Sequence, residues 1–327
     1  MASAVTEAPA RARGPAALAW LARAQGPLIG LIVLGLVFSV ASPVFLSLRN
    51  FLNVVDQVTV LGILAIGMTA VIVIGGIDLS VGSILALATM TMGWTYHDYG
   101  VPFGLCIALG LLAGVAAGLV NGLLVTQARL PAFIATLTMM SVARGLASIT
   151  TNGEQVVGFP DWFTALATVR HFHLLSATVG LFLILAAIAF AFLRFRATGR
   201  ELYAIGGSAE VARLAGIKVK NLTVAVYAAS GLLSAIAGVV MSARLDSAQP
   251  SDGLGYELDT IAAVVIGGAS LSGGVGGIGG TIIGVLIIGV LHNGLNLVGV
   301  SPFVQQVMIG AVIAIAVTFD TLRRREA

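Results

Sequence analysis

Long apolar runs, separated by short polar or glycine-rich breaks, dominate this chain. Most of them match the 17 to 25 residues that a helix needs to cross a bilayer, so the pattern predicts an all-α integral membrane protein with about ten transmembrane helices, some broken by glycine. The runs lie at roughly 27–46, 54–74, 80–95, 102–126, 131–151, 174–195, 221–243, 257–271, 276–297 and 302–320.

The composition supports a membrane protein and excludes an ordinary soluble enzyme. Of the 327 residues, 58% are hydrophobic and 9% are charged, whereas soluble domains carry about 25% charged residues. The single cysteine, Cys106, lies in an apolar run and provides no disulfide framework. Arginines precede the first run as in a signal peptide, but the run is long enough to span, so we expect an uncleaved helix.

The basic residues predict the orientation, because cytoplasmic loops accumulate Lys and Arg. An even number of spans with a cytoplasmic N-terminus leaves Arg49, Arg170 and Arg244 as the basic residues of the outer side, while Arg144 falls within a span. We therefore predict a cytoplasmic tail at 1–26, a permease domain at 27–320 and a cytoplasmic tail at 321–327. The net charge of +3 then comes from basic residues in cytoplasmic loops and does not indicate nucleic-acid binding.

The most basic segment of the chain is 194–220, a break between apolar runs with six Arg and Lys residues. Within it, Ser208 is suited to cap a short helix, Glu210 to occupy its first turn and Gly216 to end it. Val211, Leu214 and Ala215 would share one apolar face. Such a helix is either a cytoplasmic docking surface or a solvated connector.

Glycines recur at every fourth position in two runs, which predicts close helix packing. They are Gly110, Gly114, Gly118 and Gly122, and then Gly276, Gly280 and Gly284. The sequence Asn-Gly-Leu followed by a proline occurs at 121–131 and again at 293–302. The repeat gives the chain a weak inverted-repeat character, as in transporters built from two inverted halves.

Two glycine-rich junctions, 74–82 and 266–274, interrupt the apolar pattern and predict broken helices beside a translocation path. Asp78 and Ser80 in the first junction either cap the following helix or contact the solute. Asn121, Asn293 and Asn296 either form interhelical hydrogen bonds or line the path. Asp246, Gln249, Asp252 and Glu257 surround an outer loop, where they are hydrated or contact a delivery protein.

No pattern for catalysis or metal binding is present. The glycine-rich stretch 273–280 lacks the Lys-Ser or Lys-Thr of a phosphate-binding loop. The four histidines have no Cys or carboxylate partners at ligand spacing. We therefore predict no catalytic residue, no metal site and no cofactor held by this chain; ATP and Mg would be bound by a separate ATPase.

Several long motifs resemble the ribose-type permease family of ATP-binding-cassette (ABC) sugar importers, within the branched-chain amino acid and monosaccharide permease superfamily. The resemblance covers about 45–320. It rests on GGIDLSVGS from Gly75, PAFIATLTMMSVARG from Pro131, TGRELYAIGGSAEVARLAGI from Thr198, SAQPSDGLGYELDTIAAVVIGGASLSGG from Ser247, and GTIIGVLIIGVLHNGLNLVGV from Gly280.

The resemblance implies a transporter subunit of the bacterial inner membrane rather than an enzyme. Its partners would be a second permease copy or close paralogue, cytoplasmic ABC ATPase subunits, a periplasmic or lipid-anchored sugar-binding protein and a monosaccharide, ribose first, with no nucleic acid. The family's coupling loop carries over to Gly199, Arg200, Glu201, Gly206, Gly207, Glu210, Ala212, Arg213 and Gly216.

Three alternatives remain open. In the first, the chain is a self-sufficient transporter driven by protons or sodium, and Asp78 binds the ion. In the second, the chain is an ABC permease for another cargo, such as a different sugar, a nucleoside, a branched-chain amino acid or a signalling furanone. The third alternative is a channel-like facilitator, which would not need a basic docking loop.

Overall fold

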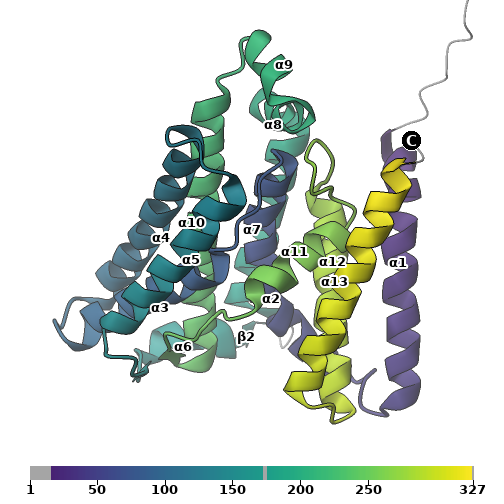
Figure 1. The fold of residues 1–327 in the computed structure, drawn as a ribbon. Coiled ribbons are helices and arrows are strands. Elements are labelled where there is room, and N and C mark those ends of the chain that lie inside the picture. Colours follow the sequence, from purple (N-terminus) through teal and green to yellow (C-terminus); the bar gives the residue numbers. More distant parts are fainter. Residues whose placement is uncertain (1–15, 172–174, 326–327) are drawn as a thin grey trace, which may run out of the picture.

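A computed structural model describes residues 16–171 and 175–325, and these form an α-helical bundle with four very short strands (Figure 1). The all-α class is confirmed. The helices are α1 (Ala16–Ala41), α2 (Leu48–Val73), α3 (Val81–His97), α4 (Phe103–Thr126), α5 (Ala132–Ile149), α6 (Asp161–Thr168), α7 (Ala177–Phe195), α8 (Ala197–Gly207), α9 (Ala209–Leu214), α10 (Val219–Leu245), α11 (Tyr256–Ile266), α12 (Ile278–Leu297) and α13 (Pro302–Arg325).

Each predicted apolar run falls on a helix of the structure, but not all of these helices are full spans. Six helices in the described part of the chain have the length and hydropathy to cross a membrane: α2, α4, α5, α7, α10 and α12. Shorter apolar stretches occur at Gly26–Ala41 and Pro302–Val312. Helix α3 has 17 residues and α11 has 11, so α11 covers only about half the 30 Å hydrocarbon thickness at 1.5 Å per residue.

Helices extend into both of the predicted tails. Helix α1 begins at Ala16, inside the stretch predicted to be an unstructured tail, because alanine and leucine between Ala16 and Arg23 have high helix propensity. The rest of that predicted tail, 1–15, lies outside the described residues. At the other end, α13 continues to Arg325 rather than stopping near 320, so most of the predicted C-terminal tail is helical.

The segment between α5 and α7 contains structure that the hydrophobic pattern did not predict. It holds α6 and the strands β1 (Val156–Val157), β2 (Arg170–His171) and β3 (Leu175–Ser176). β1 pairs antiparallel with β4 (Ser247–Ala248), which follows α10, and β2 pairs with β3. These elements gather at the lower end of the bundle in Figure 1, below α10 and α7.

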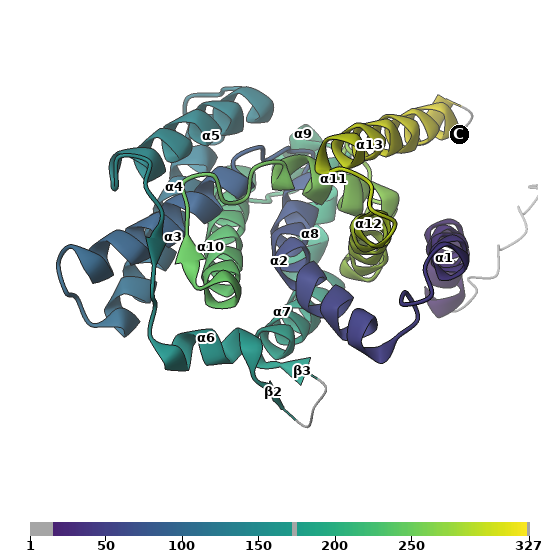
Figure 2. The same cartoon turned by 90° about the horizontal axis from the view of Figure 1, so that it is seen from below.

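Helix α2 is the centre of the bundle. In the view of Figure 2, α10, α7, α11 and α12 surround it, and 78% of its most apolar window is buried. A helix that is apolar on all sides is buried on all sides. The core that results runs along α2, where Ile63, Met68 and Ile72 are fully buried.

The first glycine strip is confirmed as a packing surface, and so are Gly280 and Gly284 of the second, whereas Gly276 lies in the loop before α12. A Cβ added at Gly114 of α4 would lie 2.6 Å from the Gly231 carbonyl oxygen of α10, and one added at Gly122 would lie 2.7 Å from the Val224 Cα. The α4 and α10 backbones therefore touch directly. On α12, Gly280 and Gly284 pack in the same way against the backbone of α11.

The two ends of the bundle carry different elements. Helices α8 and α9 project at the top of Figure 1, and the Ala16 end of α1 and the Arg325 end of α13 lie at that same end. We call this the α9 end and the opposite one the α6 end. This arrangement agrees with the prediction that the basic loop and both chain ends share one side.

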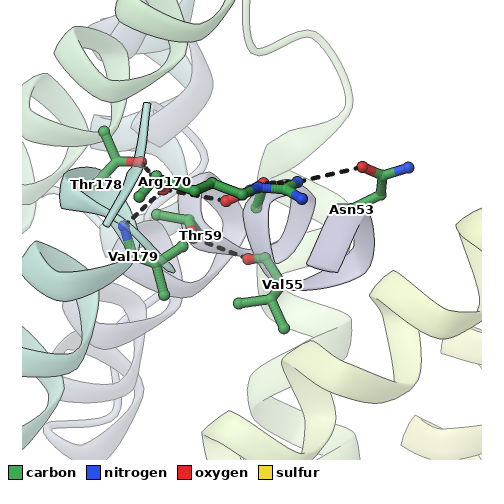
Figure 3. Close-up of polar contacts among 8 residues, drawn as sticks. Asn53, Val55, Thr59, Arg170, Thr178 and Val179 are labelled. Carbon is green, nitrogen blue, oxygen red and sulfur yellow. Dashed lines mark hydrogen bonds and ion pairs between the residues drawn. The ribbon is translucent and has the colours of Figure 1, made fainter. Parts of the chain in front are cut away.

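An ion pair fastens the β2–β3 hairpin to α2 at the α6 end (Figure 3). Arg170 of β2 donates to the Asp56 Oδ2 of α2 at 2.7 Å, and the Ser176 hydroxyl donates to Asp56 Oδ1 at 3.0 Å. Arg170 also reaches Asn53 at 3.4 Å. The pair accounts for one of the few basic residues assigned to the outer side.

Candidate functional site

The first glycine-rich break, 74–82, connects α2 to α3 and holds a buried carboxylate. Gly75 has φ of 80°, a conformation that glycine adopts without strain, and it ends α2. Asp78 is fully buried. Its Oδ1 accepts hydrogen bonds from the backbone nitrogen and hydroxyl of Ser80, and its Oδ2 accepts from the Ser230 hydroxyl of α10 at 2.8 Å.

Asp78 thus forms a turn with Ser80 before α3, whereas the N-cap of α3, Ser80, makes no side-chain capping hydrogen bond. Asn121 of α4 donates to the Ser80 hydroxyl at 2.8 Å and completes a network that joins α3, α4 and α10. The Asn121 Oδ1 and the Tyr227 hydroxyl are buried without a hydrogen-bond partner among the described residues. A role of Asp78, Ser80 or Asn121 in the path stays a prediction.

The second glycine-rich break, 266–274, connects α11 to α12 and lies against the first break. The Gly274 nitrogen donates to the Val73 carbonyl at the end of α2, at 2.9 Å. A Cβ added at Gly273 would lie 2.9 Å from the Gly75 Cα and 2.8 Å from the Gly206 carbonyl oxygen of α8. The two broken-helix junctions and α8 therefore meet in one backbone contact, which we call the glycine junction.

Helix α8 holds this junction through two residues. Gly206 packs against the backbone of Val73 and Gly274 so closely that no Cβ would fit. The Tyr203 hydroxyl donates to the Gly276 carbonyl at 3.0 Å. Burial raises the pKa of Tyr203, so the phenol remains protonated and able to donate. The basic segment is therefore attached to both broken helices.

Helix α9 has the local structure that its sequence predicts. The Ser208 hydroxyl accepts from the Val211 nitrogen at 3.3 Å, and Gly216 adopts φ of 85° just after the helix. Arg213 donates to Glu210 at 2.6 Å, and this hydrogen bond lowers the pKa of Glu210. Val211 and Leu214 are 64% and 73% exposed, so α9 presents apolar side chains outward.

The other coupling-loop residues divide into packed and exposed positions. Gly199 packs against the α7 backbone, where a Cβ would lie 2.8 Å from the Leu193 Cα, and Ala212 is buried. Arg200 and Gly207 are exposed, and Glu201 is partly exposed. The loop thus combines a buried attachment with an exposed surface.

The polar residues near the outer loop mainly organise the α10–α11 segment. Asp246 ends α10 with φ of 51° and accepts from the Phe159 nitrogen at 3.0 Å. Asp252 is buried and accepts from the Gln249 nitrogen at 2.9 Å. Glu257 accepts from the Gly255 nitrogen at 3.3 Å. Contact of these residues with a delivery protein stays a prediction.

The comparisons with known proteins agree with this organisation. The family described as branched-chain amino acid transport system / permease component matches residues 50–317. The ribose import permease RbsC of Bacillus subtilis is 47% identical over 90% of this chain and 92% of its own. RbsC of Escherichia coli K12 is 43% identical (94% and 96%), and the L-arabinose permease AraH of that strain 35% (92% and 91%). No solved structure matches.

The chain belongs to this permease family. It is therefore a multi-pass membrane component of a transporter and not an enzyme, as the sequence predicted. In the part of the permease that the structure describes, no three His, Cys, Asp or Glu side chains are grouped to hold a metal ion.

The remaining predicted path residues of the permease form interhelical hydrogen bonds. Asn293 of α12 and Asn50 of α2 exchange two amide hydrogen bonds of 2.9 and 3.0 Å. Asn296 accepts from Gln305 of α13 at 2.8 Å. Sequence reasoning named both asparagines but missed their partners, because pairing between residues far apart in the chain leaves no local pattern.

Sequence reasoning also did not predict the contacts of three residues whose partners are distant in the chain, although it named Gly206 and Arg144. Tyr203 and Gly206 lie more than 60 residues before Gly274 and Gly276. Arg144 of α5 donates through Nη1 to the carbonyl oxygens of Pro250 and Asp252. The available signal for Arg144 was its charge within an apolar run, since such residues are rarely without a function.

Proposed function

We propose that the permease carries a monosaccharide, D-ribose first, across the bacterial inner membrane as part of an ABC importer. The observation that carries this proposal is the identity of 42–47% with three ribose import permeases over 90% or more of the chain. Relatives named for L-arabinose are 35–37% identical. Ribose is therefore the first candidate and L-arabinose the second.

The proposed assembly contains two copies of the permease, or this chain and a close paralogue, with two cytoplasmic ATPase subunits. Each copy would cross the membrane about ten times, with both termini in the cytoplasm. We also propose that the chain has a weak inverted-repeat character, on the basis of the repeated Asn-Gly-Leu sequence. ATP and Mg would be bound by the ATPase, since this chain lacks the sequence of a phosphate-binding loop.

Helix α9 is the proposed docking element for the ATPase. Val211 and Leu214 expose their apolar side chains, which a solvated connector has no reason to do. The α9 backbone continues into α8, which holds the glycine junction through Gly206 and Tyr203. A movement of α9 imposed by the ATPase would reach α2, α11 and α12 through these contacts.

Two helices that follow breaks in the apolar pattern also support a transport path. Helix α11 has 11 residues and is shorter than a full span, α3 has 17 residues, and their starts meet where Gly82 packs against the Gly253 backbone. Discontinuous helices that begin within the membrane commonly surround substrate sites in transporters. This supports a path near the beginnings of α3 and α11.

Reconstitution tests the proposal. Proteoliposomes would contain the permease with its cognate ATPase, and the ribose-binding protein would be added outside. We expect ATP-dependent uptake of D-ribose that is lost with a hydrolysis-deficient ATPase and that a proton or sodium gradient cannot replace. Uptake driven by an ion gradient in the permease alone would refute the ABC assignment. ATP-dependent uptake of L-arabinose but not D-ribose would refute the proposed cargo.

A further inference from the structure

A cleft of about 360 Å³ lies between the end of α5 and the α10–α11 segment. Figure 2 shows this segment running from β4 towards α11 beside α5. Most of the side chains that line the cleft carry hydrogen-bonding groups, and a few are apolar. They are Arg144, Ser148, Gly153, Gln155, Gln249, Pro250, Ser251 and Leu254.

Arg144 forms one wall of the cleft and holds the opposite wall in place. Its Nη1 donates to the Asp252 carbonyl at 2.7 Å and to the Pro250 carbonyl. The Nε and Nη2 groups donate to no described residue and leave hydrogen-bonding capacity at the cleft.

Two glutamines are brought together by the short β1–β4 pairing. Val156 lies opposite Ala248 and Val157 opposite Ser247 in this antiparallel ladder. Gln155 directly precedes β1 and Gln249 directly follows β4, so both residues flank this ladder, and both line the cleft. Because the two amides line the same cleft, one small ligand can contact them together.

The lining matches a neutral polyhydroxylated ligand. Primary amides and serine hydroxyls both donate and accept hydrogen bonds, as sugar hydroxyls do, and no carboxylate side chain lines the cleft. Pro250 and Leu254 supply an apolar patch for the C–H face of a sugar ring. The volume falls in the usual range of about 300–1,000 Å³ for small-molecule sites.

The cleft also lies beside the starts of α11 and α3. Leu254 is followed by Gly255, the N-cap of α11, and preceded by Gly253, which packs on Gly82 at the start of α3. A ligand in the cleft therefore lies beside the segment that precedes α11 and contacts the first turn of α3.

We propose that this cleft is the receiving site for the sugar on the side of the binding protein. The inference rests on the proposed function and adds the residues that first contact the released monosaccharide. Gln155, Gln249 and Arg144 would hold its hydroxyl groups before the path opens to the α9 end.

The test compares Q155L and Q249L, singly and together, with Q127L. Gln127 follows α4 and lies outside the cleft, so Q127L controls for the chemical change. In the reconstituted complex with D-ribose, each cleft substitution should lower the uptake rate about fivefold, as expected for one lost neutral hydrogen bond. Stimulation of the ATPase by loaded binding protein should persist in all variants.

Three results of this comparison have distinct meanings. Uptake by the double variant within twofold of wild type would overturn the cleft assignment and leave the proposed function intact. Loss of both uptake and ATPase stimulation would also overturn it, because the glutamines would then serve the fold or docking. No D-ribose uptake by wild type would refute the proposed cargo and, with it, the cleft as a ribose site.

Cysteine protection provides a binding measurement that does not depend on transport. Ser148 lines the cleft and Cys106 is the sole native cysteine, so S148C would be placed in a C106A background. We expect saturating D-ribose to slow modification of S148C by a small thiol reagent in the full complex, by about threefold or more. Equal modification rates with and without D-ribose would overturn the proposal.

Discussion

Substitution of Gly206 by alanine should disrupt the contact between α8 and the two broken helices. A Cβ at this position would lie 3.0 Å from the Val73 carbonyl carbon, and the Val73 oxygen and Gly274 nitrogen would be closer still. Carbon atoms in contact are normally about 3.5–4.0 Å apart. Because all three obstructing atoms belong to the backbone, no side-chain rotation can relieve the overlap.

The expected cost follows from two contributions. Insertion of a methyl group into a tightly packed site costs about 1–3 kcal/mol. The Gly274 N–H to Val73 carbonyl hydrogen bond, 2.9 Å long, would be stretched at a further cost of about 1 kcal/mol. The sum is about 2–4 kcal/mol. With an unfolding entropy of about 2.1 cal/mol/K per residue over 327 residues, this corresponds to about 3–6 °C in Tm.

Gly207 offers a matched control one residue away. A Cβ at Gly207 would meet no atom within 4 Å, so G207A makes the same chemical change on the same helix without an overlap. We expect thermal unfolding of the purified permease to show G206A several degrees below G207A. G206A should also lose coupled uptake in the reconstituted complex. A Tm for G206A within about 1 °C of G207A would refute the packing argument.

Three further predictions concern the buried network, the asparagine pair and the topology. D78A removes the acceptor of two serine hydroxyls and should lower stability by about 3 kcal/mol, whereas retention of wild-type Tm would contradict the network. N50A leaves the buried Asn293 amide unpaired and should cost about 1–3 kcal/mol; a double change to leucine should be less harmful than N50A in the same melting experiment. S208C in a C106A background should react with an impermeant thiol reagent only from the cytoplasmic side, and labelling from outside would reverse the proposed orientation.

Local sequence signals predicted the helices well because each depends on neighbouring residues. The limits of α9 follow from Ser208, whose hydroxyl caps the helix, and from Gly216, whose positive φ ends it. The span pattern likewise depends on runs of apolar residues, and its helices were found within a few positions. The start of α1 was misplaced because Pro27 was taken as the first helical residue, whereas it lies inside the helix.

The contacts that organise the candidate site were less predictable because they join residues distant in the chain. The repeated glycines predicted packing but not which helix each would touch; Gly114 meets Gly231, and Gly206 meets Val73. Arg144 was recognised as a charge within a span, yet its carbonyl partners lie about 106 and 108 residues away. Likewise, no sequence pattern of Gln155 or Gln249 predicts that both line one cleft beside the β1–β4 ladder.

An ATPase docked on α9, as proposed, would act on the broken helices through the glycine junction. Side chains absorb small displacements by changing rotamer, whereas contacting backbones must move together. In the permease the contacts from Gly206 to Val73 and from Gly273 to Gly75 involve backbone atoms on both sides. A displacement of α8 would therefore act directly on the end of α2 and on the loop between α11 and α12. Because this loop follows α11, and α11 begins beside the proposed sugar cleft, one 11-residue helix separates the loop from the cleft.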